Sequence, residues 1–314
     1  MRKTRRRELR ARALRALVRA GVLVPAPLVR GLLTAASPLA GFTRYERRTA
    51  ANLELALGAE TSASQRRRIA RGVRLHAARI FPEWLKLARG GDGAWIDRVV
   101  ALDPSIATLR RELDRGRGVI VVTAHLGNWE LLCARLRRLG LEGAVVGYER
   151  PGDPSSAWLA GMRRAYGVET LPQNTSARGI LRVLQRGGVV GLLADLEART
   201  IDGEFLPFFG VPALTMTAPA ALARAAGIPL VPARCIVVPG GGYRLSVEEP
   251  LALDSALPRR EATTDLAGRL NIVFERWIRE SPEQWSWHQS RWRTRPDGDR
   301  RGFPKDGSSV LIYS

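Results

Sequence analysis

One short stretch constrains the fold of this chain more than any other, an apolar run that ends at a histidine. Residues 119–122 are all β-branched and follow a glycine-containing turn, and a short apolar run bounded by glycine predicts a buried strand. Asn128 can cap a helix predicted by the leucine spacing from Leu131 to Leu139. His125 therefore lies in a strand-to-helix turn at the carboxyl end of a strand, where open α/β sheets place their chemistry.

Glu130 is the nearest acidic residue to follow this histidine, five positions on. In one continuous helix, five residues turn a side chain by about 140°, so the two can meet only with His125 on the turn and Glu130 in the first helical turn. A histidine hydrogen-bonded to a carboxylate is a general base held in one tautomer. Spacing alone favours the alternative, a turn histidine beside a glutamate that only suits the helix dipole.

Beyond this turn the chain alternates apolar β-branched runs with helical patterns. Such alternation predicts a single α/β domain with a mostly parallel sheet flanked by helices. The run at 243–247 follows three glycines and suits an antiparallel strand, which would make the sheet mixed. The other expected strands are residues 119–124, 144–148, 168–171, 189–194 and 230–238, and the expected helices are residues 128–139, 154–166, 176–187, 217–226 and 261–280.

The charge of the chain indicates an anionic partner. Its 314 residues carry 50 Lys and Arg against 30 Asp and Glu, a net charge of +20, which suits nucleic acid, an anionic membrane surface or an acidic carrier protein. Two scattered cysteines and three histidines give no metal-ligand cluster and no disulfide framework. No run reaches the roughly eighteen apolar residues that span a bilayer, so we expect no transmembrane helix and no metal.

The amino-terminal residues predict a basic amphipathic helix. Residues 1–30 hold ten basic side chains and one acidic side chain, and Leu9, Ala13 and Leu17 fall on helical spacing. Such a helix lies flat on an anionic membrane, although a solvated helix packed on the domain and a nucleic-acid-binding arm are alternatives. We expect a membrane-associating segment at 1–44, the main domain at 45–305 and a tail at 306–314.

Tryptophan and arginine gather near the other end of the chain. Trp277, Trp285, Trp287 and Trp292 are four of the eight tryptophans, and they share a short segment with the arginines at positions 291, 293 and 295. Trp and Arg together suit a membrane interface. They equally suit a segment packed over the core, which we favour for Trp285.

Five motifs, in order, resemble one enzyme family. The sequence His125-Leu-Gly-Asn-Trp-Glu130 after an apolar strand resembles the H-x-x-x-x-[DE] signature of glycerolipid-type acyltransferases, and its G-N-W-E version resembles the lipid A biosynthesis acyltransferases, the lauroyl and myristoyl transferases. Further similar segments bring the resemblance to residues 45–296. They are Tyr148–Pro151, Gly191–Asp195, Gly203–Thr217 and Pro282–Pro296.

The resemblance implies acyl transfer from a thioester to a hydroxyl, with no further cofactor. His125 would take the hydroxyl proton, and Glu130 would hold the ring and stabilise the imidazolium. Arg163 matches an arginine that the family uses near the site, and Arg164 takes its place if the alignment slips by one. Arg150 and Arg163 are candidates for phosphate contacts, and Asp195 is a third functional carboxylate or a turn cap.

The expected donor is acyl-carrier protein or acyl-CoA, and the expected acceptor is a lipid A precursor or a similar glycolipid. We expect a peripheral protein on the cytoplasmic face of the inner membrane, and we favour a monomer. The sequence departs from the family pattern at Asp195-Leu196-Glu197 and at Ala218. Because of these departures, an aminolipid or a phosphatidylinositol mannoside is an alternative acceptor. The alternative of another class is a basic nucleic-acid-binding protein, although no recognition motif supports it.

Overall fold

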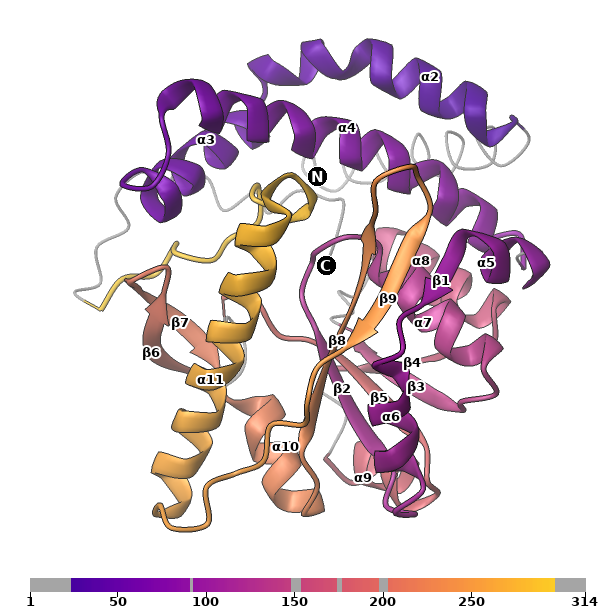
Figure 1. Ribbon diagram of the computed structural model, residues 1–314, viewed down its shortest axis with the longest axis vertical. Helices are drawn as coiled ribbons and strands as arrows, with labels where there is room; N and C mark the ends of the chain where they lie inside the picture. The colour runs from indigo at the N-terminus through magenta and orange to yellow at the C-terminus, as the bar shows by residue number, and fades with distance from the viewer. Residues whose placement is uncertain (1–23, 91–92, 148–153, 174–176, 198–202, 297–314) are drawn as a thin grey trace, which may run out of the picture.

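The fold centres on a seven-stranded mixed sheet with helices on both faces (Figure 1). The computed structural model describes residues 24–90, 93–147, 154–173, 177–197 and 203–296. The strand order is β1-β9-β8-β2-β5-β3-β4, with β8, β2, β5, β3 and β4 parallel and β9 antiparallel to β8. The strands are β1 (Val100–Leu102), β2 (Val119–Thr123), β3 (Gly143–Gly147), β4 (Glu169–Pro172), β5 (Val189–Leu193), β8 (Leu230–Val237) and β9 (Tyr243–Val247).

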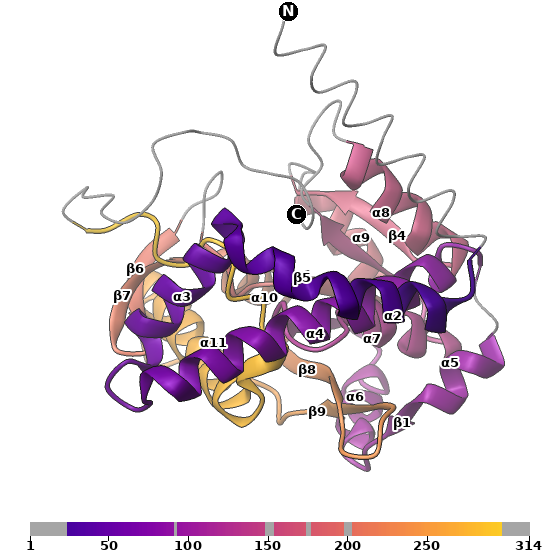
Figure 2. The same cartoon turned by 90° about the horizontal axis from the view of Figure 1, so that it is seen from above.

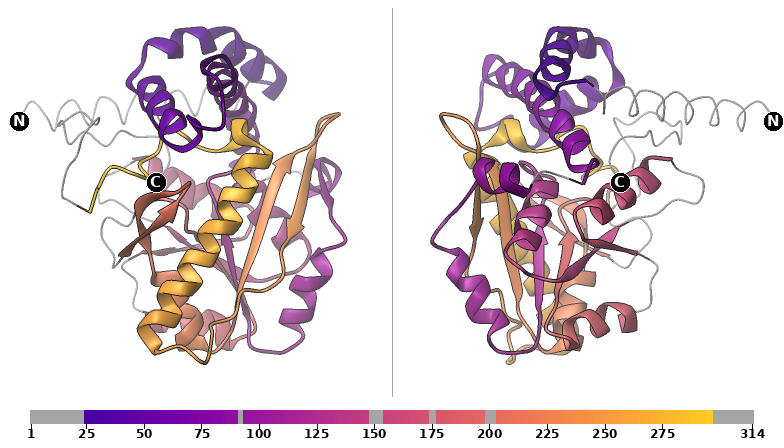
Figure 3. Two further views of the ribbon diagram at one scale, coloured as in Figure 1. Left: turned by 60° about the vertical axis from the view of Figure 1, so that its left-hand side comes forward. Right: turned by 90° about the vertical axis from the view of Figure 1, so that its right-hand side faces the viewer.

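The β-branched run of β2 forms the middle of this sheet because both of its faces are covered. Ile120 and Val122 join the core on one face, and Val119 and Val121 join the core on the other, as the alternation of side chains along a strand requires. The first face is covered by α9 (Ala177–Gln185), α10 (Ala218–Ala226) and α11 (Arg259–Glu280), and the second by α5 (Gly93–Val99), α6 (Ile106–Leu113), α7 (Trp129–Arg138) and α8 (Pro154–Ala165). Figure 3 shows α11 running alongside the sheet.

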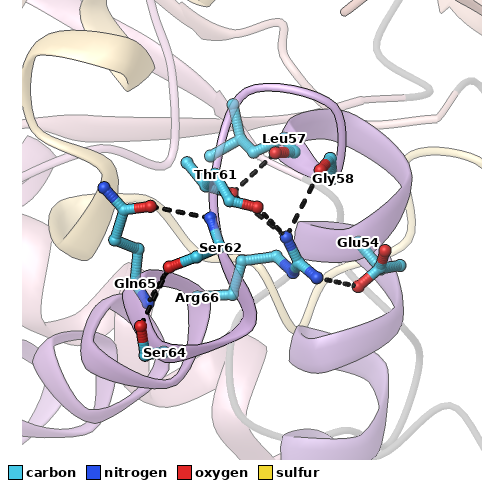
Figure 4. Close-up of polar contacts among 8 residues, drawn as sticks. All are labelled: Glu54, Leu57, Gly58, Thr61, Ser62, Ser64, Gln65 and Arg66. Carbon is cyan, nitrogen blue, oxygen red and sulfur yellow. Dashed lines mark hydrogen bonds and ion pairs between the residues drawn. The ribbon is translucent and has the colours of Figure 1, made fainter.

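Three further helices form a layer across one end of the sheet (Figures 1 and 2). They are α2 (Ala26–Ala36), α3 (Arg44–Leu57) and α4 (Ala63–Leu87), with a 3₁₀ turn, η1 (Ser37–Phe42), between the first two. The long α4 begins in a capping box, in which Ser62 accepts from the Gln65 N–H and the Gln65 side chain accepts from the Ser62 N–H. Figure 4 shows this turn, where Arg66 reaches back to Glu54 and to the carbonyl of Gly58.

The sequence-based expectations on fold class are confirmed, including the antiparallel strand β9. The two-stranded antiparallel hairpin of β6 (Gly203–Phe208) and β7 (Val211–Met216), which packs against α11, was not expected, and neither was helix α5. The tryptophan segment packs over the core, because Trp277, Trp285, Trp287 and Trp292 are each at most 1% exposed. Residues 1–23 of the amphipathic helix expected over residues 1–30 lie outside the described residues, as does the tail at 306–314.

No helix in the described part of the chain is both long enough and apolar enough to cross a membrane. The largest exposed apolar side chains near the amino terminus lie on α2 and η1, where Leu28, Leu32 and Leu39 are 56%, 62% and 72% exposed.

Candidate active site

The register between β2 and β5 brings His125 and Asp195 together. The two strands are parallel neighbours, and Thr123 pairs with Leu193. His125 and Asp195 each follow two residues later, so both side chains leave the same edge of the sheet at the same level. This edge is formed by the carboxyl ends of the parallel strands, where α/β folds place ligands.

Asp195 holds the His125 ring in one orientation. Its Oδ1 lies 2.8 Å from His125 Nδ1, and its Oδ2 accepts the His125 backbone N–H at 2.9 Å and the Trp285 indole N–H at 2.7 Å. Burial by itself would raise the pKa of this carboxyl, but the adjacent His125 and the hydrogen bonds that the carboxylate accepts hold its pKa below the usual value. An ionised Asp195 therefore accepts the Nδ1 proton, which leaves Nε2 as the basic nitrogen.

The turn that carries His125 is fixed by segments distant in sequence. Gly127 has φ +64°, and a Cβ there would lie 2.1 Å from the carbonyl oxygen of Cys235, so only glycine fits. The Gly127 N–H donates to the carbonyl of Gln284 at 3.0 Å, and the Ser286 N–H donates to the carbonyl of His125 at 3.0 Å. The buried tryptophan segment thus packs directly against the turn that carries His125.

Glu130 does not hydrogen-bond to His125 in the described structure, which corrects the pairing expected from sequence. Glu130 is fully buried. Its carboxylate accepts hydrogen bonds from Arg163 Nη2 at 2.6 Å, from Arg163 Nε at 3.1 and 3.2 Å, and from the Tyr166 hydroxyl at 2.7 Å. Asn128 accepts the Leu131 N–H and starts α7 at Trp129. Because α7 begins at Trp129, the Glu130 carboxylate in its first turn faces α8. A buried carboxylate is stable only beside a cation, and Arg163 of α8 supplies it.

The three arginines expected near the site have different positions in the structure. Arg163 is 8% exposed and bound to Glu130, and its Nη1 lies beside Gly147 at the carboxyl end of β3. Burial opposes the charge of Arg163, but Glu130 raises the pKa of the guanidinium above its ordinary value, so the pair is ionic. Arg164 is exposed on the outer side of α8, and Arg150 lies outside the described residues.

Helix α4 supplies residues that sequence reasoning left out. His76 Nε2 lies 3.0 Å from the Gly127 carbonyl, which only accepts, so the ring donates from Nε2. Burial lowers the pKa of His76 to about 4, which keeps this ring neutral. Glu83 accepts from the Asn128 side-chain amide at 2.8 Å, and Trp84 donates to the amide oxygen at 2.9 Å. The apolar periodicity of α4 predicts only that this helix packs on the core. No local pattern predicts its contacts with the turn at Gly127 and Asn128, which lies 45–51 residues further along the chain.

His288 also lies in the neighbourhood of His125. His288 packs edge-on against Tyr45, with ring centroids 5.8 Å apart. Burial and the neighbouring His125 lower the pKa of His288 to about 4. No group of three or more His, Cys, Asp or Glu side chains able to hold a metal occurs among the described residues. The arrangement therefore consists of an oriented imidazole, a buried carboxylate and a separate buried ion pair.

Comparisons with known proteins point to one enzyme family. The chain is 30% identical to the lipid A biosynthesis lauroyltransferase of Escherichia coli over 212 residues, 65% of this chain and 66% of the relative. It is 27% identical to the lipid A biosynthesis acyltransferase of Haemophilus influenzae over 57% of each chain, and 27% identical to the palmitoleoyltransferase of Escherichia coli over 65% of this chain and 64% of that protein. The matches thus span just under two thirds of the first relative's length. A family model described as bacterial lipid A biosynthesis acyltransferase matches residues 3–294, and the chain belongs to this family.

Proposed function

We propose that this protein transfers a fatty acyl chain from a thioester to a hydroxyl of a lipid A precursor, with His125 as the general base. The observation that carries the proposal is the 2.8 Å contact between His125 Nδ1 and Asp195 at the carboxyl edge of the sheet. Family membership supports the reaction class.

In this mechanism Nε2 of His125 takes the proton of the acceptor hydroxyl as its oxygen attacks the thioester carbonyl carbon. The tetrahedral intermediate then expels the thiolate, which receives the proton back from the imidazolium. Asp195 stabilises the imidazolium, as the acid does in hydrolase triads, and Trp285 holds Asp195 in place through its 2.7 Å hydrogen bond. No side-chain nucleophile is required, because the acceptor itself attacks. Positioned base catalysis contributes about 10²–10⁴-fold.

In this proposal Glu130 has a different role from the one that the family resemblance implies. Bound to Glu130 through Nε and Nη2, Arg163 has its Nη1 directed to Gly147 at the same edge of the sheet. A guanidinium fixed in this way is suited to a phosphate of the acceptor or to the developing oxyanion. Glu130 would then be a positioning residue that acts through Arg163.

The donor in this proposal is acyl-carrier protein or acyl-CoA, and no cofactor beyond the thioester is needed. The names of the relatives, a lauroyltransferase and a palmitoleoyltransferase of lipid A biosynthesis, support a fatty acyl donor and a lipid A precursor as acceptor. Acylation of an aminolipid or a phosphatidylinositol mannoside on the same scaffold is the alternative for the acceptor.

We place the protein peripherally on the cytoplasmic face of the inner membrane. The exposed leucines of α2 and η1, Leu28, Leu32 and Leu39, support this placement, because a lipid surface takes up such side chains from an amphipathic helix. The net charge of +20 favours an anionic surface.

The test uses purified protein, a detergent-solubilised lipid A precursor and either acyl-carrier protein or acyl-CoA as donor, with products identified by mass spectrometry. Wild type should add one acyl chain, and His125→Ala should abolish transfer. His125 is 7% exposed and its ring binds the buried Asp195, so the substitution should lower the free energy of unfolding, and urea denaturation checks that the variant is still folded. A folded His125→Ala protein with full transfer activity would refute the mechanism, and activity only on another lipid would change the acceptor.

A further inference from the structure

Glu83 of α4 connects the turn that carries His125 to strand β9. Its Oε2 accepts a hydrogen bond from the Asn128 side-chain amide at 2.8 Å and a second one from the Tyr243 hydroxyl. Asn128 follows His125 by three residues, and Tyr243 is the first residue of β9. One carboxylate oxygen therefore joins three segments that are far apart in the sequence.

The Asn128 side chain depends on Glu83 for its orientation. Its Oδ1 accepts the Leu131 N–H at 3.1 Å and the Trp84 indole N–H at 2.9 Å. The amide oxygen faces these two donors, so the amide NH₂ points towards Glu83. Asn128 is fully buried, and a buried donor without an acceptor is unfavourable. Glu83 thus determines the orientation in which Asn128 caps α7.

Helix α4, which crosses the end of the sheet (Figure 1), binds two consecutive residues of the turn. His76 donates to the Gly127 carbonyl at 3.0 Å, and Glu83 accepts from Asn128. These two side chains are seven positions apart, about two helical turns, so they lie on one face of α4. The Asn128 backbone N–H donates to a carbonyl of β8 at 2.8 Å. Bonds from α4 and β8 therefore fix the backbone two and three positions after His125.

The carboxyl of Glu83 is held in place against a desolvation penalty. Its side chain is 18% exposed. Burial raises the pKa of Glu83 above its ordinary value, although the hydrogen bonds from Tyr243 and Asn128 and the charge of Arg79 oppose this shift. An apolar side chain would fill the same space without the penalty. The penalty indicates a role beyond packing, because buried ionisable groups with shifted pKa values are concentrated at functional sites.

We propose that Glu83 is a positioning residue for acyl transfer, which acts through Asn128 to hold His125 where its Nε2 meets the acceptor hydroxyl. The inference rests on the proposed function and adds to it a residue outside the pair of His125 and Asp195. Asp195 fixes the rotation of the imidazole ring, whereas Glu83 fixes the backbone that carries the ring. Glu83 touches no reacting atom, and its effect on rate is geometric: a displacement of about 1 Å lowers a rate by about 10²-fold.

The test compares two substitutions that separate the reach of the Glu83 side chain from its charge. Glu83→Asp keeps the charge but shortens the side chain by one methylene, so the carboxylate is withdrawn from Asn128 and Tyr243. Glu83→Gln keeps the length, and its amide oxygen can accept the same two hydrogen bonds. A residue that only positions the turn needs the reach and not the charge.

The Glu83→Asp protein should show a kcat about 10–100-fold below wild type, and the Glu83→Gln protein should stay within about threefold. The KM for the donor and the KM for the acceptor should remain at wild-type values in both. Neither substitution changes a residue that the proposed function places against a substrate. Urea denaturation of each variant checks that it is folded.

The matched control is Glu248→Asp, the same change at the opposite end of β9. Glu248 accepts the Trp277 indole N–H at 2.7 Å and pairs with Arg276 at 2.8 Å. Because β9 is antiparallel to β8, Glu248 lies at the edge of the sheet away from His125. Glu248→Asp should lower the urea midpoint and leave kcat unchanged. A comparable fall in kcat in this control would assign the effect to a general loss of stability and overturn the inference.

Hydrogen–deuterium exchange of residues 126–132, measured by mass spectrometry without substrate, separates this inference from the proposed function. The backbone amides of Asn128 and Leu131 should exchange faster in Glu83→Asp than in wild type, Glu83→Gln or the control, which supports the inference even if the acceptor is misidentified. An unchanged kcat or unchanged exchange in Glu83→Asp overturns the inference while transfer stands. Equal losses of kcat in the Asp and Gln variants also overturn it, because the charge would then matter. Absence of transfer by wild type from every donor would refute the proposed function instead.

Discussion

Replacement of Asp195 by Asn tests which carboxylate orients His125, the proposed general base. Asp195 Oδ2 accepts two N–H groups, from the His125 backbone and from Trp285, while Oδ1 faces His125 Nδ1. In the Asn variant the amide oxygen must stay with the two N–H donors, which places the amide NH₂ against Nδ1. The ring then accepts at Nδ1 and carries its proton on Nε2, where it no longer acts as a base.

The expected loss is large in turnover and small in stability. In serine-protease triads the same carboxylate-to-amide change lowers kcat about 10⁴-fold through the wrong tautomer. Here we expect a kcat lower by about 10³–10⁴-fold, or about 4–5.5 kcal/mol in activation free energy. The shape of the side chain is kept, and one charge-assisted hydrogen bond becomes neutral, so the free energy of unfolding should fall by only about 1–2 kcal/mol.

The assay is the initial rate of acyl transfer against acceptor concentration for wild type and Asp195→Asn, with urea denaturation of each protein. The KM for the acceptor should not change, because among the described residues the Asp195 carboxylate hydrogen-bonds only to the His125 ring, the His125 backbone and Trp285. A folded Asp195→Asn protein with kcat within about threefold of wild type would refute the assignment. Glu130 would then be the next candidate for the partner of His125.

Other expectations follow from the buried charges and the exposed leucines. Glu130→Gln leaves its guanidinium partner buried without a counter-charge, so denaturation should show a loss of about 3–5 kcal/mol, and an unchanged stability would contradict the ion pair. His76 and His288 have pKa values of about 4 in the folded chain and titrate near 6.5 when unfolded. Their stabilisation is therefore complete above pH 6.5 and is lost as the pH falls from there through about 4, by about 2.5 kcal/mol each at pH 4.5; urea midpoints that are flat between pH 7 and 4.5 would disprove this. Leu28→Ser with Leu32→Ser should weaken flotation with anionic vesicles while the melting temperature stays near wild type, and unaltered flotation would place the membrane contact elsewhere.

Local sequence was enough for the fold class and for the turn at its centre. The β-branched run, the glycine before it and the capping Asn128 each act within a few residues, so β2, α7 and the position of His125 at the sheet edge could be predicted. The alternation of strands and helices likewise predicted the parallel sheet. The hairpin of β6 and β7 was missed because its pairing joins strands whose apolar residues are interrupted by proline at positions 207 and 212.

The partners of the buried charges were decided by tertiary structure alone. The family resemblance favoured Glu130 for His125, but Asp195 lies seventy residues away and meets His125 because β5 pairs with β2 in a register that no local signal encodes. Glu130 is bound by Arg163, thirty-three residues distant, because the first turn of α7 packs against α8. Burial makes an unpaired charge expensive, so each carboxylate takes the counter-charge that packing supplies. The sequence by itself determined the strand, the turn and the histidine; the order of strands in the sheet decided which acid that histidine meets.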